Sequence, residues 1–298
     1  MLKSSLFAST AIVALSLAGA AWADCTEYDP FTAAVQNNAF EDATALYETL
    51  YLNPSCDTAL RNWGARYLAR ENFIRGKKAD DPAASEGYYE AALNYEEHWR
   101  TYAELGHLAW DRSDYNASAK YYQMSVNMLA DGPAEHHATQ EDIETVFDLA
   151  SAAVALADGE IEVPKTRSGA PGGILVGSVR GFVVEEVSLP VTFLFGQTTF
   201  DEGGARFASL LADHLVEVGA KRVELSGHTD PIGDEDANMK LSLKRAKALE
   251  EFLVEQGFEG EISVQGFGET QPPQAVNGMD TDSQEFHRLS RRVVFKLG

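Results

Sequence analysis

Apolar residues recur at helical spacing through the first half of the chain. From about Asp24 to Leu156 the sequence is rich in Ala, Tyr, Leu and Glu and has few runs of β-branched residues. These residue types favour helices, and apolar positions three or four residues apart place one face of each helix against a neighbour. The pattern predicts an all-α N-terminal domain.

The second half alternates between strand and helix patterns. Two longer amphipathic segments, 202–218 and 237–256, predict helices, and Gly257 favours a left-handed end to the second one. Right-handed crossovers then lay both helices on one sheet. We predict an α+β protein overall, whose second domain contains strands near Val191–Phe195, Arg222–Ser226, Ile262–Phe267 and Arg292–Leu297.

The composition changes between these halves. Gly, Pro, Ser and Val dominate from Asp158 to Ser188, with the breaker cluster Ser168–Gly173. These glycines lack the GxxxxGK[ST] pattern of a phosphate loop. The predicted organisation is a signal peptide at 1–23, a helical domain at 24–157, a linker at 158–188 and a second domain at 189–298.

The first residues are typical of an export signal. Lys3 precedes an apolar stretch too short to span a bilayer, Leu6–Leu17, and Ala21-Trp22-Ala23 fits small-x-small processing before Asp24. Ala20 stands where a lipoprotein has its cysteine, so we expect cleavage without a lipid anchor. No later segment is a long uncharged apolar run, so we expect no transmembrane segment in the mature chain.

Export makes the two cysteines informative. An even pair in an oxidising compartment can form a disulfide, so we expect a bond between Cys25 and Cys56. The alternative is free thiols. Neither cysteine has a CxxC or Cys/His setting that indicates redox or metal chemistry.

The charge of the chain narrows its partners. Asp and Glu number 46 against 24 Lys and Arg, a formal net charge of −22. Such a balance argues against binding to nucleic acid and against docking on anionic lipid.

A pairing of a small residue with Tyr four positions later recurs in the helical half. It occurs at Ala43 and Tyr47, Ala84 and Tyr88, and Ala117 and Tyr121. With Leu105-Gly106, Tyr102 and Tyr115, the third unit resembles a tetratricopeptide (TPR) repeat; irregular helix pairs are the alternative. We interpret the aromatic side chains as core between repeats rather than ligand contacts: Tyr88, Tyr89, Trp99, Tyr121 and Tyr122.

One charged residue occupies an unusual position in the second domain. On the predicted helix 237–256, Arg245 lies in the middle of the apolar face and nearly in line with Asn238. A guanidinium that faces a sheet needs a carboxylate or several acceptors to replace its hydration. Asp230 follows the second strand, at the sheet end where ligands of α/β folds gather. The pair forms either an internal salt bridge or one side of a binding cleft.

Four ordered motifs in the last 110 residues carry a family resemblance. Gly227-His228-Thr229-Asp230-x-x-Gly233, Asn238-x-x-Leu241-Ser242-x-x-Arg245-Ala246, Gly268-Glu269-x-x-Pro272 and Arg291-Arg292-Val293 look like the signature of OmpA-like domains. The resemblance implies a βαβαββ domain that binds the diaminopimelate of uncrosslinked peptidoglycan stems.

The family's ligand contacts fall on named positions of this chain. The resemblance assigns the ligand to Asp230 and Arg245, with Asn238 beside them and Thr229 and Leu241 within the same motifs. The second basic contact falls on the Arg291-Arg292 pair, of which one should face the ligand because strand side chains alternate. Ser290 departs from the family's Asn, which weakens a polar contact there.

The same residues make chemical sense without the family. Diaminopimelate ends in a free amino-acid group, so its receptor needs a carboxylate for the ammonium and a guanidinium for the carboxylate. Asp230 and Arg245 supply that complement.

Other polar residues offer no comparable site. His214 lies on the apolar face of its helix and is interpreted as a core histidine, the adjacent His136 and His137 cannot share a helical face, and His228 belongs to the family motif. The sequence contains no Gly-x-Ser-x-Gly or HExxH motif, so we predict no enzyme, cofactor or metal.

We therefore expect a periplasmic adaptor at the inner face of the outer membrane. Its second domain binds peptidoglycan, and its helical repeats present a surface to an envelope protein. The alternatives are a wall-modifying enzyme with an unrecognised site in the helical half, and a structural spacer.

The predicted processing site can be tested by mass. We expect the exported protein to begin at or near Asp24, because Ala21 and Ala23 fit the processing pocket. Intact mass spectrometry of periplasmic protein measures this. Retention of residues 1–23, or a diacylglycerol adduct, would contradict it.

Overall fold

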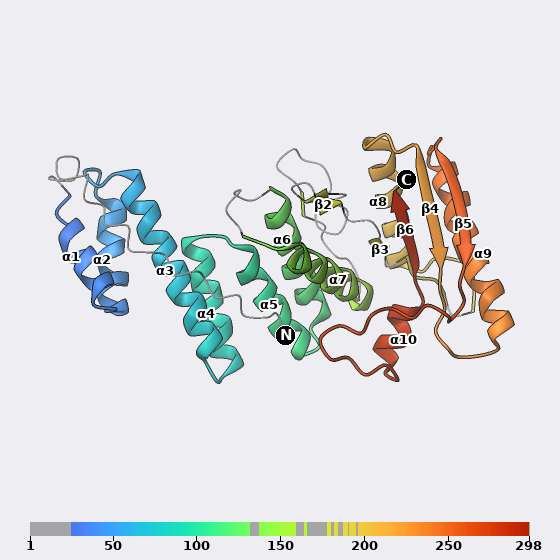
Figure 1. Ribbon diagram of the computed structural model, residues 1–298, viewed down its shortest axis with the longest axis horizontal. Coiled ribbons are helices and arrows are strands. Elements are labelled where there is room, and N and C mark those ends of the chain that lie inside the picture. The colour runs from blue at the N-terminus through green and yellow to red at the C-terminus, as the bar shows by residue number, and fades with distance from the viewer. Residues whose placement is uncertain are drawn as a thin grey trace. The chain divides into compact units, whose positions relative to one another are not determined.

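The computed structural model describes residues 25–131, 137–158, 164–165, 178–179, 182–183, 187–189, 191–194 and 196–297 (Figure 1). Two compact units make up the chain, residues 1–101 and 102–298. The predicted signal peptide and most of the predicted linker lie outside the described residues. The boundary between the two units falls inside a helix of the predicted helical domain. It does not test the predicted domain limits, which stay predictions.

The first unit is built from helices that begin at acidic caps. Asp57 accepts a hydrogen bond from Leu60 N, and Asp81 accepts one from Ala84 N with Pro82 in the first helical position. The predicted all-α character of this region is confirmed. The helices are α1 (Tyr28–Gln36), α2 (Phe40–Leu52), α3 (Thr58–Lys78), α4 (Pro82–Tyr95) and the start of α5 (Trp99–Asp111).

In each of two helix pairs of this unit, a glycine of one helix packs under a tyrosine ring of the other. A Cβ atom on Gly64 would lie 2.7 Å from the ring of Tyr47, and one on Gly76 would lie 2.5 Å from the ring of Tyr89. Both distances are shorter than any real contact, so only glycine lets α3 approach α2 and α4 this closely. The glycines are therefore part of the packing between neighbouring helices.

The repeated motif is offset from the predicted register in its second and third copies. Tyr47, Tyr89 and Tyr122 are buried, whereas Tyr88 and Tyr121 are half-buried. Serines replace the predicted alanines beneath the rings of the last two copies, Ser85 and Ser118. Two adjacent tyrosines satisfy the same sequence pattern, and only the helix rotation decides which one faces the neighbour.

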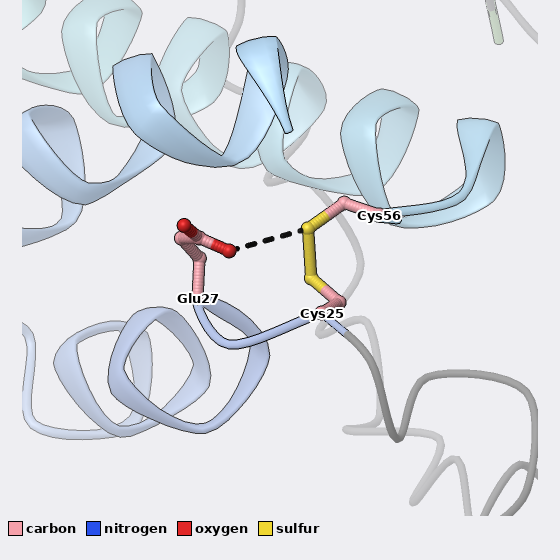
Figure 2. A group of neighbouring side chains, drawn as sticks. All are labelled: Cys25, Glu27 and Cys56. Atoms are coloured by element: carbon pink, nitrogen blue, oxygen red, sulfur yellow. Dashed lines mark hydrogen bonds between the residues drawn. A yellow bond between two sulfur atoms is a disulfide. The ribbon is translucent and has the colours of Figure 1, made fainter. Parts of the chain in front are cut away.

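The predicted disulfide is present and closes the first helix pair. Cys25 and Cys56 are bonded, with a Cα–Cα distance of 4.8 Å, and both are buried (Figure 2). The bond ties the chain before α1 to the turn before α3. Figure 2 also shows the Glu27 carboxylate 3.6 Å from Cys56 Sγ, which is a packing contact because a disulfide sulfur has no proton to donate.

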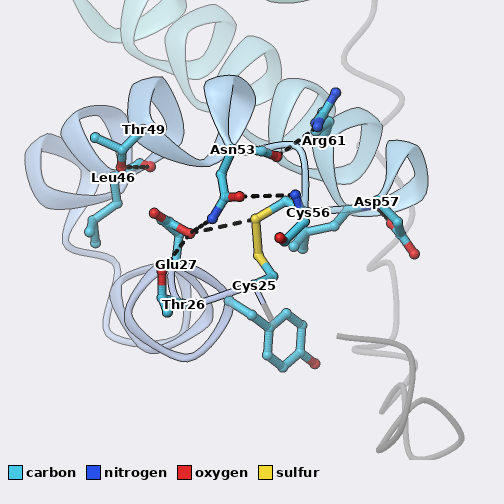
Figure 3. The surroundings of a disulfide bond; sticks show 12 residues. Cys25, Thr26, Glu27, Leu46, Thr49, Asn53, Cys56, Asp57 and Arg61 are labelled. Carbon is cyan, nitrogen blue, oxygen red and sulfur yellow. Dashed lines mark hydrogen bonds between the residues drawn. A yellow bond between two sulfur atoms is a disulfide. The ribbon is translucent and has the colours of Figure 1, made fainter. Parts of the chain in front are cut away.

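Hydrogen bonds hold the turn beside the disulfide. Asn53 Nδ2 donates to Glu27 Oε2 at 2.6 Å, and its Oδ1 accepts from Ser55 N at 2.9 Å (Figure 3). Arg61 donates to the Asn53 carbonyl at 2.7 Å. The bond from Asn53, followed by a smaller one from Thr26, lowers the pKa of Glu27 against the opposing effect of desolvation. The α2–α3 turn is thereby tied to the residues before α1.

The helices of the second unit repeat the glycine-under-tyrosine contact. A Cβ atom on Gly106 of α5 would lie 2.8 Å from the Tyr122 ring, and Ser118 Oγ donates to the Gly106 carbonyl at 2.9 Å. Helix α6 (Tyr115–Asp131) packs along α7 (Gln140–Leu156). Thr139 and Asp142 begin α7 with reciprocal hydrogen bonds, a capping box.

The sheet of the second unit has the strand order β3-β6-β4-β5. β4 and β5 are parallel, and β6 runs antiparallel to both β3 and β4. α9 packs across β4 and β5 and contacts α8, which confirms two helices on one sheet (Figure 1). The elements are β3 (Val187–Leu189), α8 (Glu202–Glu217), β4 (Arg222–Gly227), α9 (Glu235–Glu255), β5 (Glu261–Gly266), α10 (Gln284–Ser290) and β6 (Val293–Leu297). A separate antiparallel pair joins β1 (Ser178–Val179) and β2 (Phe182–Val183).

The first strand of the sheet lies earlier than predicted. The sequence pattern placed it at Val191–Phe195, but β3 is Val187–Leu189, paired with β6 in the register Leu189 to Val293. Pro190 follows and has no backbone N–H to continue a ladder. The apolar residues beyond it form a turn instead, with Phe193 bridged to Phe200.

Helix α7 contacts the C-terminal part of the same unit through α10 (Figure 1). The Arg288 guanidinium donates to the carbonyls of Leu156 and Ala157, both at 3.1 Å, and lies 3.2 Å from Asp158 Oδ1. These carbonyls end α7 and have no partner within the helix. Arg288 therefore satisfies the last carbonyls of α7 and places a positive charge at the negative end of its dipole.

Among the described helices, none combines the length and the apolar character needed to cross a bilayer.

The disulfide should make a measurable contribution to stability. Replacing both Cys25 and Cys56 by Ala should lower the free energy of unfolding of the first unit by about 3 kcal/mol, because the bond closes a loop in the unfolded chain. Urea denaturation followed by tryptophan fluorescence measures this. The parent protein in excess reductant is the matched control and should unfold at the same midpoint; a double variant as stable as the oxidised parent would contradict the expectation.

Candidate functional site

The loop after β4 is held in place by backbone hydrogen bonds. His228 N donates to the Arg292 carbonyl at 2.9 Å, and Thr229 N donates to the Gly268 carbonyl at 2.8 Å. These bonds continue the β4 ladder past its last residue and tie the loop to the chain after β5. The side chains of His228, Thr229 and Asp230 are all buried, so the loop forms a fixed wall.

Close contact with α9 sets the position of the helix over this loop. A Cβ atom on Gly227 would lie 2.1 Å from the Ser242 carbonyl, and one on Gly266 would lie 2.5 Å from Leu243 N. Ser242 Oγ accepts a hydrogen bond from Gly268 N at 2.9 Å. Glycine at the ends of both parallel strands therefore brings α9 within backbone contact of the sheet.

Asn238 joins the three segments that surround the site. Its Nδ2 lies 3.2 Å from the Asp230 carbonyl, 3.3 Å from the Ile232 carbonyl and 2.7 Å from Glu269 Oε2. The side chain is buried and is directed toward the loop rather than toward solvent. In this structure Asn238 orders the loop that carries Asp230.

The Asp230 carboxylate has two partners. Its Oδ2 accepts from Arg291 Nη1 at 2.5 Å, and its Oδ1 accepts from Ile232 N at 3.2 Å. Asp230 is 5% exposed, so this ion pair is largely shielded from water.

The Arg245 guanidinium is buried without a carboxylate partner. It is 2% exposed, its Nε donates to the Gln197 carbonyl at 3.2 Å, and its Cζ lies 5.2 Å from the centre of the Phe193 ring. Within the described part of the chain it forms no ion pair with Asp230, so the internal salt bridge considered from the sequence is not seen. The structure brings the predicted pair into one site but gives the carboxylate to Arg291.

The pKa of Arg245 reflects its surroundings. Burial lowers it most, the nearby charge of Arg291 lowers it further, and Asp230 opposes both by raising it. Arginine remains protonated even so, because its ordinary pKa is far above neutrality. The site therefore holds a buried positive charge that lacks a direct counter-charge.

The adjacent arginines face different ways, and both lie between the end of α10 and the start of β6. Arg291 reaches Asp230, whereas Arg292 Nη2 donates to the Gln271 carbonyl at 3.3 Å. Arg292 also lines a cavity of about 150 Å³ against Ala152 of α7, with Pro272 beside it. Of the two sequence candidates, Arg291 is thus the one placed with Asp230.

The remaining sequence candidates lie at the margins of the site. Thr229 is buried, and its hydroxyl has no partner among the described residues. Leu241 is half-buried on α9. Ser290, which stands where the family has Asn, donates to the Phe286 carbonyl at 2.9 Å within α10.

Sequence reasoning missed the residues that contact Arg245 from the other side. Phe193 and Gln197 belong to the turn that the pattern read as a strand, and Gly196 within it has a positive φ of 67°. Leu194 N donates to the Thr199 carbonyl at 2.9 Å, which closes the turn. The adjacent Gly196 and Gln197 were a turn signal that could have indicated it.

The histidines lie apart from this chemistry. His228 is buried, its ring stacks on Phe267 with centres 5.5 Å apart, and burial, reinforced by the charge of Arg292, lowers its pKa to about 3. His214 is also buried, as expected, and its pKa is lowered by desolvation. His137 is exposed, and His136 lies outside the described residues.

Among the described residues, one group has metal-ligand geometry. Cys25, Glu27 and Cys56 offer atoms within 4.8 Å of one another, but both sulfurs belong to the disulfide. This group therefore cannot supply thiolates while the bond is intact.

This part of the chain thus combines a four-stranded sheet, packed helices and a charged site beyond the strand ends. Residues 192–285 match the model of the OmpA family, and this part of the chain is an OmpA family domain. Outer membrane porin F of Pseudomonas fluorescens is 36% identical over 111 residues, which cover 37% of this chain and 32% of that protein. The chain thus spans about a third of the length of the curated relatives it matches.

Solved structures resemble the same region. The cell wall anchor of the T6SS from Pseudomonas aeruginosa matches with a TM-score of 0.32 and 24% identity, over 39% of this chain and 83% of that chain. The peptidoglycan-associated lipoprotein from Burkholderia pseudomallei matches with a TM-score of 0.30 and 20% identity, over 38% of this chain and 88% of that chain.

The buried His228 should make stability depend on pH. In the unfolded chain the imidazole binds a proton below its ordinary pKa of 6.5, whereas in the folded chain it does so only near 3. The free energy of unfolding should therefore fall as pH decreases from 6.5, with a limiting slope of about 1.4 kcal/mol per pH unit from this group. Chemical denaturation between pH 7 and pH 5 measures the slope.

Two histidine variants separate this effect from other titrations. His228→Phe should keep the stacked ring and flatten the slope, whereas His137→Phe removes an exposed histidine and should leave it unchanged. Equal slopes for the parent and His228→Phe would contradict the assignment.

Proposed function

We propose that this protein is a non-enzymatic periplasmic protein of the cell envelope that binds peptidoglycan non-covalently. The observation that carries the proposal is the arrangement of Asp230 and Arg245 in one buried site of an OmpA family domain. The ligand is the free amino-acid end of diaminopimelate in uncrosslinked stem peptides. Its carboxylate meets Arg245, and its ammonium meets Asp230.

The burial of both groups supports an ionic ligand. An arginine that is 2% exposed and has one carbonyl acceptor is incompletely compensated, and a ligand carboxylate would complete its hydrogen bonds.

The helical half is proposed to present a surface to another envelope protein, and TPR-like repeats are the architecture we propose for it. Tyr51 and Leu52 at the end of α2 are 57% and 78% exposed, and Trp63 of α3 is also exposed. Exposed aromatic and aliphatic side chains of this size are common in protein interfaces. We place the protein near the inner face of the outer membrane.

Wall binding can be tested by sedimentation of the full mature chain with purified sacculi. The full chain is preferable to residues 189–298 alone, because α7 contacts α10 and its removal would expose that surface. Arg245→Ala should remove most binding, since a ligand carboxylate that loses its buried counter-charge costs about 2–5 kcal/mol, or roughly thirty-fold or more in affinity. Asp230→Ala should weaken binding less, because its carboxylate already has Arg291 as a partner. Arg245→Lys should also bind poorly, because an ammonium cannot reproduce two parallel hydrogen bonds.

The chain offers a matched control for each of the two positions. Asp236→Ala and Lys244→Ala remove exposed charges of the same sign from α9 and should sediment as the parent does. Circular dichroism and thermal melting check folding, above all for the buried Arg245. A folded Arg245→Ala protein that sediments like the parent would exclude the diaminopimelate site. Release of soluble wall fragments during incubation would instead indicate a wall-modifying enzyme.

A further inference from the structure

The charges of the site are unequally satisfied. Asp230 already has a cationic partner at 2.5 Å and a backbone N–H at 3.2 Å, so each of its carboxylate oxygens accepts one hydrogen bond. Arg245 has a carbonyl and the face of an aromatic ring, and neither carries a full negative charge. Among the described residues, Arg291 is therefore paired with the Asp230 carboxylate, whereas Arg245 has no carboxylate partner.

We propose that Arg291 determines which end of the ligand the site recognises. Its ion pair occupies the carboxylate that a ligand ammonium would use, so the ligand's carboxylate supplies most of the binding through Arg245. The inference rests on the proposed function and adds an order of importance to its two ionic contacts. The ligand class is a stem peptide with a free carboxylate, and the amine beside that carboxylate contributes less to binding.

The carboxylate and the ammonium of the ligand would bind to side chains that differ in the partners they already have. A carboxylate that reaches Arg245 forms a charge-assisted bond with a buried cation that lacks an anion, so the whole interaction is gained on binding. An ammonium that reaches Asp230 must displace or share Arg291, and one cation replaces another beside the same carboxylate. This exchange contributes little binding free energy, because the Arg291–Asp230 interaction that is lost resembles the ammonium–Asp230 interaction that forms.

The fold holds Arg291 in this position from both sides along the chain. Its backbone N donates to the His287 and Arg288 carbonyls at 3.3 and 3.2 Å, which fixes it to the end of α10. Arg288, one turn earlier, is bonded to the end of α7. β6 begins two residues later, at Val293, and pairs with β4. The side chain of Arg291 is 31% exposed, so it can leave Asp230 for solvent while its backbone stays fixed.

Three synthetic probes separate the two contacts. They are a tripeptide with a terminal meso-diaminopimelate, the same peptide with the free amine of that residue acetylated, and the same peptide with the carboxylate on the carbon that bears this amine amidated. Isothermal titration calorimetry with the full mature chain measures each affinity. For the parent, amidation should weaken binding about thirty-fold or more, and acetylation about three-fold or less.

Removing Arg291 should restore the importance of the amine. In Arg291→Gln the Asp230 carboxylate has no cationic partner, so the ammonium becomes its counter-charge and acetylation should weaken binding at least ten-fold. Arg292→Gln is the matched control: the neighbouring guanidinium is directed to Gln271, so this variant should keep the parent's small acetylation effect. The ratio of affinities within each protein removes any general loss that the variant causes.

Each result has a distinct consequence. If acetylation weakens the parent as strongly as amidation does, or if Arg291→Gln shows the parent's ratio, the assignment of Arg291 is wrong and the diaminopimelate site stands. If the unmodified peptide does not bind the folded parent, the proposed function fails and the inference fails with it. Circular dichroism checks each variant, and the two ratios for the parent decide the question even if Arg291→Gln does not fold.

Discussion

The site depends on how closely α9 approaches the ends of β4 and β5. Gly227 and Gly266 have no side chains to hold the helix away, so Ser242 lies against the backbone of one strand and bonds the loop after the other. At that distance Arg245, one turn further along α9, cannot reach bulk water. A bulkier residue at either glycine would lift the helix and let water reach the guanidinium, which would weaken its attraction for an anion. The selectivity of the site is thus set by backbone packing as much as by charged side chains.

Much of this architecture is readable from residue patterns, and the exceptions share a physical cause. Helices α8 and α9 and strands β4, β5 and β6 follow from periodicity and caps, because each has a clear apolar face and a local signal at its end. The first strand was misplaced, since the apolar residues after Pro190 pack as a turn and periodicity alone cannot distinguish the two. The register of Tyr89 and Tyr122 was missed for a similar reason: adjacent tyrosines satisfy one pattern, and tertiary packing chooses between them.

The site shows the same division between local and long-range information. Arg245 on an apolar helix face, and Asp230 beyond a strand end, were sufficient to indicate a charged site. The choice of Arg291 over Arg292 depended on where α10 ends relative to β6, and the contacts from Phe193 and Gln197 depended on a turn 48 residues away from Arg245 in the chain. Residue spacing within one helix or strand does not predict contacts between segments that are far apart in the chain. The family's ordered motifs did indicate the pair of arginines together.

Arg288 connects α10 to the end of α7 by hydrogen bonds, so a force applied to one of these helices would also act on the other. The seven residues of α10 connect the end of α7 to Arg291, so the domain proposed to hold the wall and the last helices of the array meet through hydrogen bonds to helix carbonyls. A pull on a bound wall strand would act on these bonds and on the β6–β4 ladder together. If this domain holds the wall as proposed, the resistance to such a pull includes the hydrogen bonds between Arg288 and the end of α7 as well as the covalent chain.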